Sequence, residues 1–482
     1  MIPLTLAEIS DAVGGSLHDV SDRLVQPSGV VRIDSRDVEP GDVFACVRGG
    51  DLDGHDFVAE AVARGAVLCL ASRPVDAPHV LVADVVAALG ALARAVVDRR
   101  PRVAVVGITG SSGKTSTKDL LAQVLESVAP TVSPPGSFNN ELGLPLTVLR
   151  TADDTRFLVL ELGARGVGHI RALTEVAPPH IGVVLNVGSA HLGEFGDRAA
   201  VAAAKGELVE ALVADDVAVL NADDPAVVAM RSRTKARVVT FGLAPAADVR
   251  AIGVRVDAGG RASFALTTDT GAAQVRLQLV GAHHVSNALA AAAAAVALGV
   301  DLDVVADALS AAGPRSSWRM EVTTTDDGVT VVNDAYNANP ESVRAALESL
   351  AAIGAGRRTW AVLGEMRELG AESVAAHRAI GELAVRLGVA RIVAVGAAAA
   401  PVLDGARSAG AAGDALTLAP DVPAAIDVVG EAHAGDVVLV KASRAVGLEA
   451  VADALLARGV ATGAVEATAG EDAVLEDEGG AR

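Results

Sequence analysis

Short, continuous apolar runs alternate along this chain with stretches in which apolar residues recur every three or four positions. Continuous runs of this kind are typical of strands buried on both faces, and the recurring pattern predicts the helices that cover them. The alternation therefore predicts an α/β fold built on parallel sheets. The clearest strand-like runs are 42–47, 66–71, 80–83, 157–162, 181–187, 217–220, 329–333, 359–363, 391–395 and 436–441.

The pattern divides the chain into three expected domains and a tail. Residues 1–100 predict a small N-terminal α/β domain, and residues 101–313 predict a central parallel-sheet domain of the P-loop ATPase type. Residues 314–465 predict a C-terminal Rossmann-like domain. Residues 466–482 are rich in Glu, Asp, Gly and Ala, which predicts a disordered acidic tail. The apolar run 288–300 is mostly alanine and is shorter than the roughly 20 residues of a membrane span, so we expect a buried helix there.

The segment 102–120 carries the strongest chemical signal, because a glycine-rich turn follows an apolar run and Lys114 and Thr115 then begin a helix. Glycines let backbone N–H groups face phosphate oxygens, and the helix N-terminus adds its own N–H groups. Lys114 is placed to reach the β- and γ-phosphates of a nucleoside triphosphate, and Thr115 to hold Mg²⁺. The spacing G-x-x-G-x-x-G-K-T departs from the usual pattern, which has glycine where Ile108 stands, and this indicates a particular branch of P-loop enzymes. The expected cradle comprises Gly107, Thr109, Gly110, Ser111, Ser112, Gly113, Lys114, Thr115 and Ser116. The expected helix has its apolar residues at Leu120, Leu121, Val124, Leu125 and Val128.

Three further ionisable residues of the central block are candidates for chemistry. Glu161 and His191 each follow or end an expected strand, where parallel sheets present ligands, and both suit a second Mg²⁺. Lys205 lies on an expected helix. Each also has an ordinary interpretation, as a cap for Glu161, a satisfied loop residue for His191 and a solvated lysine for Lys205.

In the C-terminal block, the segment VVNDAYNANP places Asp334, Asn337 and Asn339 on a loop before a helix. Proline at the first helical position makes Asn339 equally well an N-cap or a functional residue. Asp334 and Arg319 are better candidates for contacts to a nucleotide. The stretch GEMRELG at 364–370 lacks a full dinucleotide-binding pattern, so we do not expect NAD.

Composition excludes several classes of partner. The formal net charge of −20, with one Tyr and two Trp, argues against a nucleic acid or an anionic membrane surface. Cys46 and Cys69 lie in apolar surroundings and predict buried thiols, with neither a cysteine zinc site nor a disulfide framework. The N-terminus lacks a basic region followed by an apolar stretch, so we expect a cytoplasmic protein without membrane insertion, most simply a monomer.

Several longer motifs follow one another along the chain. They are IDSRDVEPGDVFACVRGGDLDGHDF, GITGSSGKTSTKD, SFNNELGLPLTVL, ELGARGVGHI, NVGSAHLGEFG, KGELVEAL, SSWRMEV, NDAYNANPES, LGEMRELG and VLVKASR. Taken together, these motifs resemble the Mur ligases of peptidoglycan synthesis, and within them the branch that adds a D-Ala-D-Ala dipeptide. The resemblance covers nearly the whole chain except the acidic tail. It implies an ATP-dependent ligase that joins D-Ala-D-Ala to UDP-MurNAc-tripeptide through an acyl phosphate, with two Mg²⁺ ions.

The resemblance also implies roles for single residues. Lys114, Lys205 and His191 are implied as catalytic, with Lys205 reacting with CO₂ to form a carbamate. Thr115, Glu161 and His191 are implied as Mg²⁺ ligands. The implied nucleotide contacts are Asn287 in the central block and Arg319 and Asp334 in the C-terminal block. The motif around Asn287, GAHHVSNALAAA, has His284 where the family commonly has Asn. The residues implied to contact the UDP-sugar peptide are Ser35, Arg36, Gly54, His55, Asn139 and Asn140. The residues expected near the acceptor dipeptide are Asn337, Asn339, Lys441, Ser443 and Arg444.

Other functions remain possible at this point. The nearest alternative is a sister ligase that adds a single amino acid to a UDP-muramoyl peptide or to a folate glutamate tail. The motif YNANPES is typical of the dipeptide ligase, and the chain lacks the DNPR motif of the sister that reads diaminopimelate. A P-loop ATPase or small-molecule kinase and a non-catalytic nucleotide-binding module are the remaining alternatives.

Overall fold

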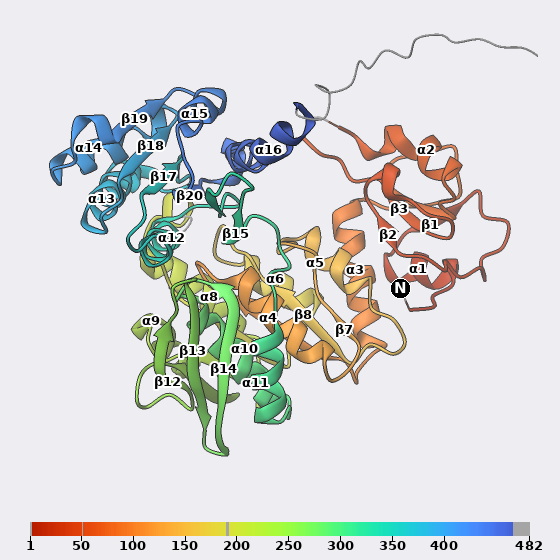
Figure 1. Ribbon diagram of the computed structural model, residues 1–482. Helices are drawn as coiled ribbons and strands as arrows, with labels where there is room; N and C mark the ends of the chain where they lie inside the picture. The colour runs from red at the N-terminus through yellow and green to blue at the C-terminus, as the bar shows by residue number, and fades with distance from the viewer. Residues whose placement is uncertain (1, 51, 189–191, 466–482) are drawn as a thin grey trace, which may run out of the picture. The chain divides into compact units, whose positions relative to one another are not determined.

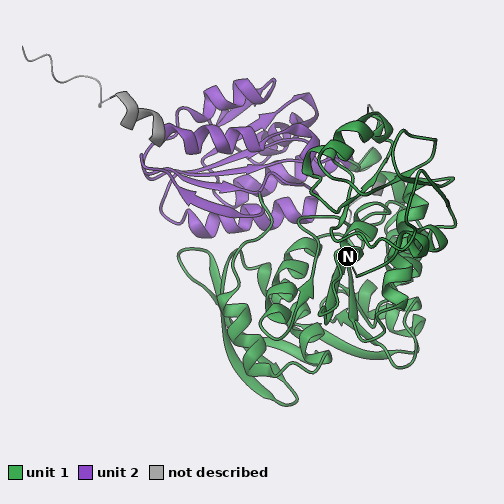
Figure 2. Cartoon of the chain, turned by 90° about the vertical axis from the view of Figure 1, so that its right-hand side faces the viewer, with its two compact units in different colours: residues 1–317, 368–372 green, residues 318–367, 373–482 purple. Residues whose placement is uncertain are grey.

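A computed structural model describes residues 2–50, 52–188 and 192–465 of the chain (Figure 1). These residues form two compact units (Figure 2). The first unit runs to Ser317 and includes Glu368–Glu372, and the second comprises Trp318–Arg367 and the chain from Ser373 onward. The first unit contains a five-stranded and a nine-stranded sheet, and the second a six-stranded sheet. The α/β class is confirmed, whereas the exact domain boundaries stay predictions and the expected acidic tail, 466–482, lies outside the described residues.

The N-terminal sheet has the strand order β1-β5-β4-β3-β2. Strands β2 to β5 pair in parallel and β1 is antiparallel to β5. Cys46 and Cys69 are buried free thiols, as predicted. The strands are β1 (Ser16–His18), β2 (Val31–Arg32), β3 (Val43–Ala45), β4 (Leu68–Ala71) and β5 (His79–Leu81). The helices are α1 (Leu6–Ala12), η1 (Ser35–Asp37), η2 (Gly54–Phe57), α2 (Val58–Ala63) and α3 (Val85–Asp98).

The central sheet has the order β14-β13-β12-β11-β10-β9-β6-β8-β7. The strands from β7 to β12 in this order pair in parallel, which confirms the predicted parallel sheet for that part. The remainder of the prediction is wrong, because β13 and β14 are antiparallel. These two strands alternate buried with exposed residues, so they present no continuous apolar run. The strands are β6 (Ala104–Thr109), β7 (Thr131–Val132), β8 (Phe157–Glu161), β9 (Ile181–Val184), β10 (Val217–Asn221), β11 (Arg237–Gly242), β12 (Val249–Val256), β13 (Arg261–Thr268) and β14 (Gly271–Val280).

Helices cover both faces of this sheet, as the continuous runs predicted. On one face α4 (Lys114–Glu126) and α10 (His284–Ala297) pack together, and α11 (Leu302–Ala311) joins them. The run Ala288–Ala295 in α10 is fully buried, which confirms the expected close-packed helix. The prediction for Val128 is wrong, since α4 ends at Glu126 and Val128 is 50% exposed beyond it.

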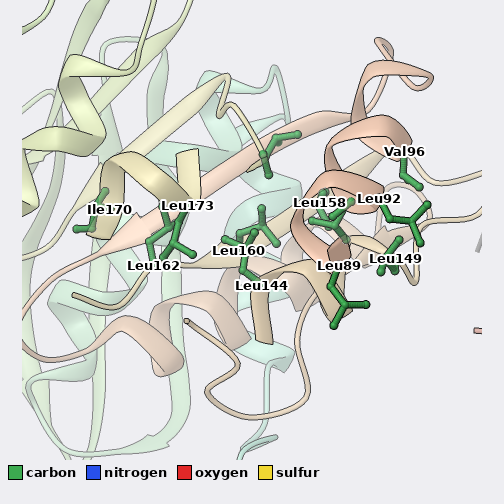
Figure 3. Close-up of a cluster of buried hydrophobic side chains, with 14 of the residues drawn as sticks. Leu89, Leu92, Val96, Leu144, Leu149, Leu158, Leu160, Leu162, Ile170 and Leu173 are labelled. Carbon is green, nitrogen blue, oxygen red and sulfur yellow. The ribbon is translucent and has the colours of Figure 1, made fainter. Parts of the chain in front are cut away.

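The opposite face carries α5 (Gly143–Val148), α6 (His169–Val176), α8 (Arg198–Glu210) and also α3. Figure 3 shows this shared core, in which Leu89 and Leu92 of α3 lie beside Leu158 of β8. Burial of each such leucine stabilises the fold by about 1.5–3 kcal/mol. Helix α3 therefore anchors the N-terminal segment to the central sheet. The short helices of this unit are α7 (Leu192–Phe195), α9 (Pro225–Val228) and η3 (Ala229–Arg233).

The sheet of the second unit has the order β15-β16-β20-β17-β18-β19 and is parallel except for β15. Helices alternate with the parallel strands, as expected for a Rossmann-like domain. The sequence pattern missed β15 and β19 because these edge strands have four residues each, with β15 mostly exposed and β19 only partly buried, so neither forms a continuous buried run. The strands are β15 (Glu321–Thr324), β16 (Thr330–Asn333), β17 (Thr359–Leu363), β18 (Arg391–Val395), β19 (Leu416–Ala419) and β20 (Val437–Lys441). The helices are α12 (Pro340–Ile353), α13 (Ser373–Arg386), η5 (Ala397–Ala399), α14 (Pro401–Ser408), η6 (Gly413–Ala415), α15 (Val422–Val429), η7 (Arg444–Val446) and α16 (Glu449–Val465). The short helix η4 (Gly370–Glu372) belongs to the first unit.

Within the described part of the chain, every helix is too short or too polar to cross a bilayer.

Candidate active site

The glycine-rich turn joins β6 to α4 and is fastened to the neighbouring strand β9. Asn186, just beyond β9, accepts the N–H of Ser111 through its carbonyl at 3.1 Å and the N–H of Ser112 through its side chain at 2.9 Å. Lys114 begins α4, and its ammonium donates to the carbonyl of Gly110 at 2.9 Å. Gly113 has a φ of +80°, which favours glycine. The turn is thus a preformed strand-to-helix loop with the geometry expected of a phosphate cradle.

Other predicted cradle residues connect this turn to neighbouring elements. The Thr109 hydroxyl donates to the carbonyl of Leu162 at 2.9 Å, which ties β6 to the end of β8. Gly107 and Gly110 have leucine side chains packed directly against them, so both allow close approach of neighbouring elements. Ser116 lies in the first turn of α4 and is half-buried.

A buried carboxylate lies beside the start of α4. Glu161, at the end of β8, is 1% exposed and accepts the Thr115 hydroxyl at 2.8 Å. It also accepts the Ser137 hydroxyl at 2.9 Å and the Asn139 amide at 2.7 Å. The Asn139 side chain therefore belongs to the cluster around Glu161. Its expected contact with the sugar peptide stays a prediction. Asn140 accepts the first N–H of α5 at 2.8 Å.

Lys205 is a buried lysine and not a solvated one. It lies on α8 and is 3% exposed, so the ordinary interpretation from sequence is wrong. Burial, together with the positive charge of Lys114, holds the pKa of Lys205 well below its usual range. The neutral form of this amine is thereby favoured relative to that of an exposed lysine. His191, the third expected catalytic residue, lies outside the described residues.

Asn287 packs against the cradle from α10. Its side-chain oxygen accepts the Thr117 hydroxyl at 3.4 Å, and a Cβ at Gly113 would overlap this oxygen. The Asn287 amide donates to the ring of His284 at 3.3 Å. His284, which replaces the common asparagine, therefore orients the residue implied to contact adenine.

In the N-terminal domain, the predicted pair Ser35 and Arg36 differs in exposure. Ser35 is buried and its hydroxyl donates to Glu60 at 2.8 Å. Arg36 is exposed and donates through Nε to Asp34 at 2.8 Å. This bond lowers the pKa of Asp34 to about 2.

Gly54 and His55 both have structural partners. A Cβ at Gly54 would overlap the backbone of Val47, so this position requires glycine for close packing. His55 Nε2 accepts the N–H of Ser72 at 2.9 Å, which leaves Nδ1 to donate to Asp53 at 2.5 Å. Both ring nitrogens of His55 thus link η2 to the segment after β4, and its predicted substrate contact stays a prediction.

The second unit holds a buried ion pair at the end of its central strands. Asp334, after β16, pairs with Lys441 at the end of β20. The Lys441 ammonium is 2% exposed and also donates to the carbonyl of Asn337 at 2.9 Å. The N–H of Met320 donates to Asp334 at 3.2 Å. The pair therefore joins three separate segments of the chain.

Two arginines of this unit stack on aromatic rings. The Arg319 guanidinium lies 4.2 Å from the centre of the Tyr336 ring, and that of Arg444 lies 4.3 Å from the Trp318 ring. Arg444 also pairs with Glu449.

Asn339 caps α12, since its side chain accepts the N–H of Ser342 at 2.8 Å and Pro340 follows it. This confirms the N-cap alternative, while the expected contact to the dipeptide stays a prediction. The Ser443 hydroxyl accepts the N–H of Arg367 at 3.0 Å.

Family models match three consecutive parts of the chain. Residues 29–107 match the Mur ligase family catalytic domain, residues 108–295 the Mur ligase middle domain, and residues 318–444 the Mur ligase glutamate ligase domain. The chain belongs to the Mur ligase family. The family resemblance deduced from the motifs is confirmed.

Within the Mur ligases, the chain is 48% identical to a UDP-N-acetylmuramoyl-tripeptide--D-alanyl-D-alanine ligase of Mycobacterium tuberculosis, over 95% of this chain and 98% of that one. It is 36% identical to the ligase of the same name from Escherichia coli, over 82% and 86% of the two chains. Among solved structures, MurF from Acinetobacter baumannii superposes with a TM-score of 0.84 at 31% identity and covers 95% of this chain and 99% of that one. MurF from Thermotoga maritima in complex with ADP gives 0.77 at 30% identity, over 90% and 98%.

Sequence reasoning missed two residues of this Mur ligase site. Asn186 accepts hydrogen bonds from the cradle, and Ser137 donates one to the Glu161 carboxylate. Asn186 lies near the end of the apolar run 181–187, and this position at a strand end was the available signal. Ser137 lies on a loop, and its place at the start of the motif SFNNELGLPLTVL was the available signal.

Proposed function

We propose that this protein catalyses the ATP-dependent joining of D-alanyl-D-alanine to the C-terminal carboxylate of UDP-MurNAc-tripeptide, which forms UDP-MurNAc-pentapeptide. The observation that carries the proposal is the combination of a phosphate cradle with the Glu161 cluster in a chain that matches the named ligases over almost its full length. The ADP complex of the Thermotoga maritima relative supports the use of ATP.

The proposed reaction has two steps. A carboxylate oxygen of the tripeptide attacks the γ-phosphorus, the bond to ADP breaks, and an acyl phosphate forms. The free amine of the dipeptide then attacks the acyl carbon, inorganic phosphate leaves, and an amide remains. A carboxylate is a poor acyl donor at neutral pH, so the phosphoryl group supplies the leaving group. Alignment of the reactants and neutralisation of charge are then the main tasks of the protein.

The cradle is suited to both tasks. In our proposal the N-terminus of α4, which begins at Lys114 directly after Gly113, binds the phosphates, while Asn186 holds the N–H groups of Ser111 and Ser112. Lys114 neutralises charge that develops on the transferred phosphoryl group. Asn287 contacts the adenine and is oriented by His284.

The oxygen donors beside the cradle fit a hard divalent cation. Glu161 offers a buried carboxylate, and Thr115 and Ser137 offer hydroxyls within hydrogen-bond distance of it. Such a set matches the preference of Mg²⁺ for oxygen ligands. We propose that Thr115 and Glu161 hold one Mg²⁺ and that His191 contributes to a second. A bound Mg²⁺ would stabilise negative charge on the phosphate oxygens.

Lys205 completes the proposed catalytic set. Its lowered pKa raises the fraction of the amine that is neutral, and a neutral amine is the form that reacts with CO₂. In the proposed modification an N–C bond forms between the neutral amine and CO₂, a proton leaves the nitrogen, and the side chain becomes an anionic carbamate. This anion would offset the cost of burying Lys205 beside Lys114.

The proposal also assigns the remaining substrate contacts, which rest on the resemblance to the family. Those to the UDP-sugar peptide are assigned to Ser35, Arg36, Gly54, His55, Asn139 and Asn140. Those to the nucleotide and the dipeptide from the second unit are assigned to Arg319, Asp334, Asn337, Asn339, Lys441, Ser443 and Arg444. We further propose that the protein acts as a cytoplasmic monomer, which sedimentation of the purified chain and cell fractionation would test.

The decisive experiment measures phosphate release with ATP, Mg²⁺ and UDP-MurNAc-tripeptide, and offers D-Ala-D-Ala, D-Ala or no acceptor. Mass spectrometry identifies the product, and Lys114→Ala serves as the control. We expect UDP-MurNAc-pentapeptide only with the dipeptide and only with the unmodified chain. Coupling of a single amino acid would instead indicate a sister ligase, and phosphate release without an amide would indicate an ATPase.

A further inference from the structure

Three consecutive buried positions of α8 face three different neighbours. Lys205 is 3% exposed on α8, and α8 packs against β6, the strand that leads into the cradle, with Leu208 against Gly107. Gly206 lies against Arg233, and Glu207 is 2% exposed and bonded to α6. Successive helical residues point about 100° apart, so these three residues contact their neighbours on three different sides of α8.

Glu207 supplies the cap that α6 lacks. The N-cap of α6 is Gly168, which has no side chain with which to accept an N–H. Glu207 accepts the N–H of Gly168 at 2.5 Å and the N–H of Arg171 at 3.0 Å. A carboxylate at this end is also favoured by the helix dipole. The two bonds fix α8 to the start of α6.

Helix α6 is in turn tied to the segment that follows Glu161. Residues 162–168 connect Glu161 to α6, and Leu162 lies in the same apolar cluster as Leu173 of α6 (Figure 3). The Leu162 carbonyl accepts the Thr109 hydroxyl at the end of β6. Glu207 is therefore joined, through α6 and this segment, to the strand ends that present Glu161 and the cradle.

Arg233 holds the other side of α8. Its guanidinium donates to the carbonyls of Ala202 and Ala203 at 3.1 and 2.9 Å, and to Glu210 at 2.8 Å. A Cβ at Gly206 would overlap the guanidinium, so the approach requires glycine at that position. The arginine thus bonds directly to the backbone one turn before Lys205.

We propose that Glu207 and Arg233 are positioning residues that fix the rotation and height of α8, so that the Lys205 amine stays directed at the phosphate cradle. The inference rests on the ligase activity proposed above. Lysine has a long, rotatable side chain, and a small shift of its helix moves the amine by a larger distance. A misplacement of about 1 Å in an active site costs about 100-fold in rate.

The test compares Glu207→Gln, Glu207→Ala and Arg233→Met in the full chain, with kcat, KM for ATP and melting temperature measured for each. Matched controls are Glu175→Gln, an exposed glutamate on α6, and Arg231→Met, an exposed arginine on η3. We expect kcat to fall about 10- to 100-fold for the Glu207→Ala and Arg233→Met variants, with KM for ATP unchanged. The controls should keep the kcat of the unmodified chain.

A double-mutant cycle separates positioning from simple stabilisation. Each change is repeated in a Lys205→Ala background, and the residual rate is measured below the melting temperature of every variant. If Glu207 and Arg233 act through Lys205, their removal has no further effect on kcat in that background. An equal loss in both backgrounds, or a loss of melting temperature with unchanged kcat, would overturn the proposal. Absence of ligation by the unmodified chain would instead contradict the proposed function.

If Glu207→Ala does not fold, the test is made with Glu207→Gln and Arg233→Met. Glutamine retains one carbonyl acceptor for the α6 N–H groups, and the arginine change leaves the cap of α6 intact. An unchanged kcat in both folded variants would likewise overturn the proposal.

Discussion

The Thr115 hydroxyl donates a 2.8 Å hydrogen bond to Glu161, a residue 46 positions further along the chain. The contact arises because β6 and β8 are parallel neighbours with Ile108 opposite Glu161. Parallel strands present their carboxyl ends at one edge, and α4 begins at that same edge. This relationship places a carboxylate where the phosphates and a cation are expected to bind.

Replacement of Glu161 by glutamine should weaken the use of Mg²⁺ and leave the fold intact. The amide preserves the size of the side chain and removes the negative charge that favours a divalent cation. We expect the Mg²⁺ concentration for half-maximal ligation to rise at least about 10-fold, a typical cost of damage to a metal site. Titration of the rate with Mg²⁺ measures this. The exposed Glu141 provides the control, Glu141→Gln, and an unchanged Mg²⁺ dependence of Glu161→Gln would contradict the assignment.

Alanine at Gly113 should abolish nucleotide binding. The position has a φ of +80°, which costs an alanine about 1–2 kcal/mol, and its Cβ would overlap the Asn287 side chain. Isothermal titration with ADP should detect no binding. Gly136→Ala is a matched control, because Gly136 also has a positive φ, of +71°, but open space around its Cβ. Equal ADP affinities of the two variants would show that the Asn287 contact is irrelevant.

Removal of CO₂ should lower the rate of the unmodified enzyme and not that of a Lys205→Ala variant. Burial and the charge of Lys114 lower the pKa of Lys205, which raises the fraction of neutral amine that can form the carbamate. We expect bicarbonate to restore the rate in CO₂-free buffer, and ¹³C-bicarbonate to give a carbamate signal in NMR. Exposed Lys235 is replaced as the control, in Lys235→Ala. A full rate without CO₂ and no carbamate signal would exclude the modification.

Asp334→Asn should destabilise the second unit. The change leaves the Lys441 ammonium buried without its negative partner, which typically costs about 3–5 kcal/mol. Both tryptophans, Trp318 and Trp360, lie in this unit, so tryptophan fluorescence during urea unfolding reports on it alone. Asp404→Asn, in an exposed pair with Arg407, should cost less than about 1 kcal/mol. Similar losses in the two variants would show that burial of the Asp334 pair is unimportant.

The stability of the second unit should fall as the pH drops below 6.5. His377 is fully buried, accepts the N–H of Met366 at 2.9 Å and donates to the carbonyl of Ser373 at 2.7 Å. Burial lowers the pKa of His377, so below pH 6.5 the unfolded chain takes up a proton that the folded chain does not. Well above pH 6.5 neither state binds the proton and this contribution is constant. The loss continues until the pH reaches the lowered pKa of the folded state.

Urea unfolding between pH 5 and 8 measures this dependence by tryptophan fluorescence. In His377→Gln the slope between pH 6.5 and the folded pKa should be smaller, because the titrating group is absent. The exposed His433 offers the control variant His433→Gln. A slope in His377→Gln equal to that of the unmodified chain would assign the pH dependence to other groups.

Much of the fold follows from local pattern. The continuous apolar runs predicted the parallel strands and their helices, and the glycine-rich turn before Lys114 predicted the cradle. Strands such as β13 and β19 escaped prediction because polar or partly buried residues alternate with the buried ones, or the strand is short, so neither presents a continuous apolar run. Their place in a sheet depends on partners far away in the sequence, which no local window contains.

The sequence by itself determined which residue types stand at strand ends and helix starts, since backbone sterics and hydrophobic periodicity are local. Only the tertiary structure decided what those residues touch. Lys205 and Glu207 have the appearance of surface helix residues in sequence, yet packing of α8 buries both. Asn139 donates to Glu161 and His55 accepts from Ser72, through contacts between separate segments that chain topology creates. Burial, charge proximity and pKa depend on distance in space, and distance in space is set by the packing of the whole fold.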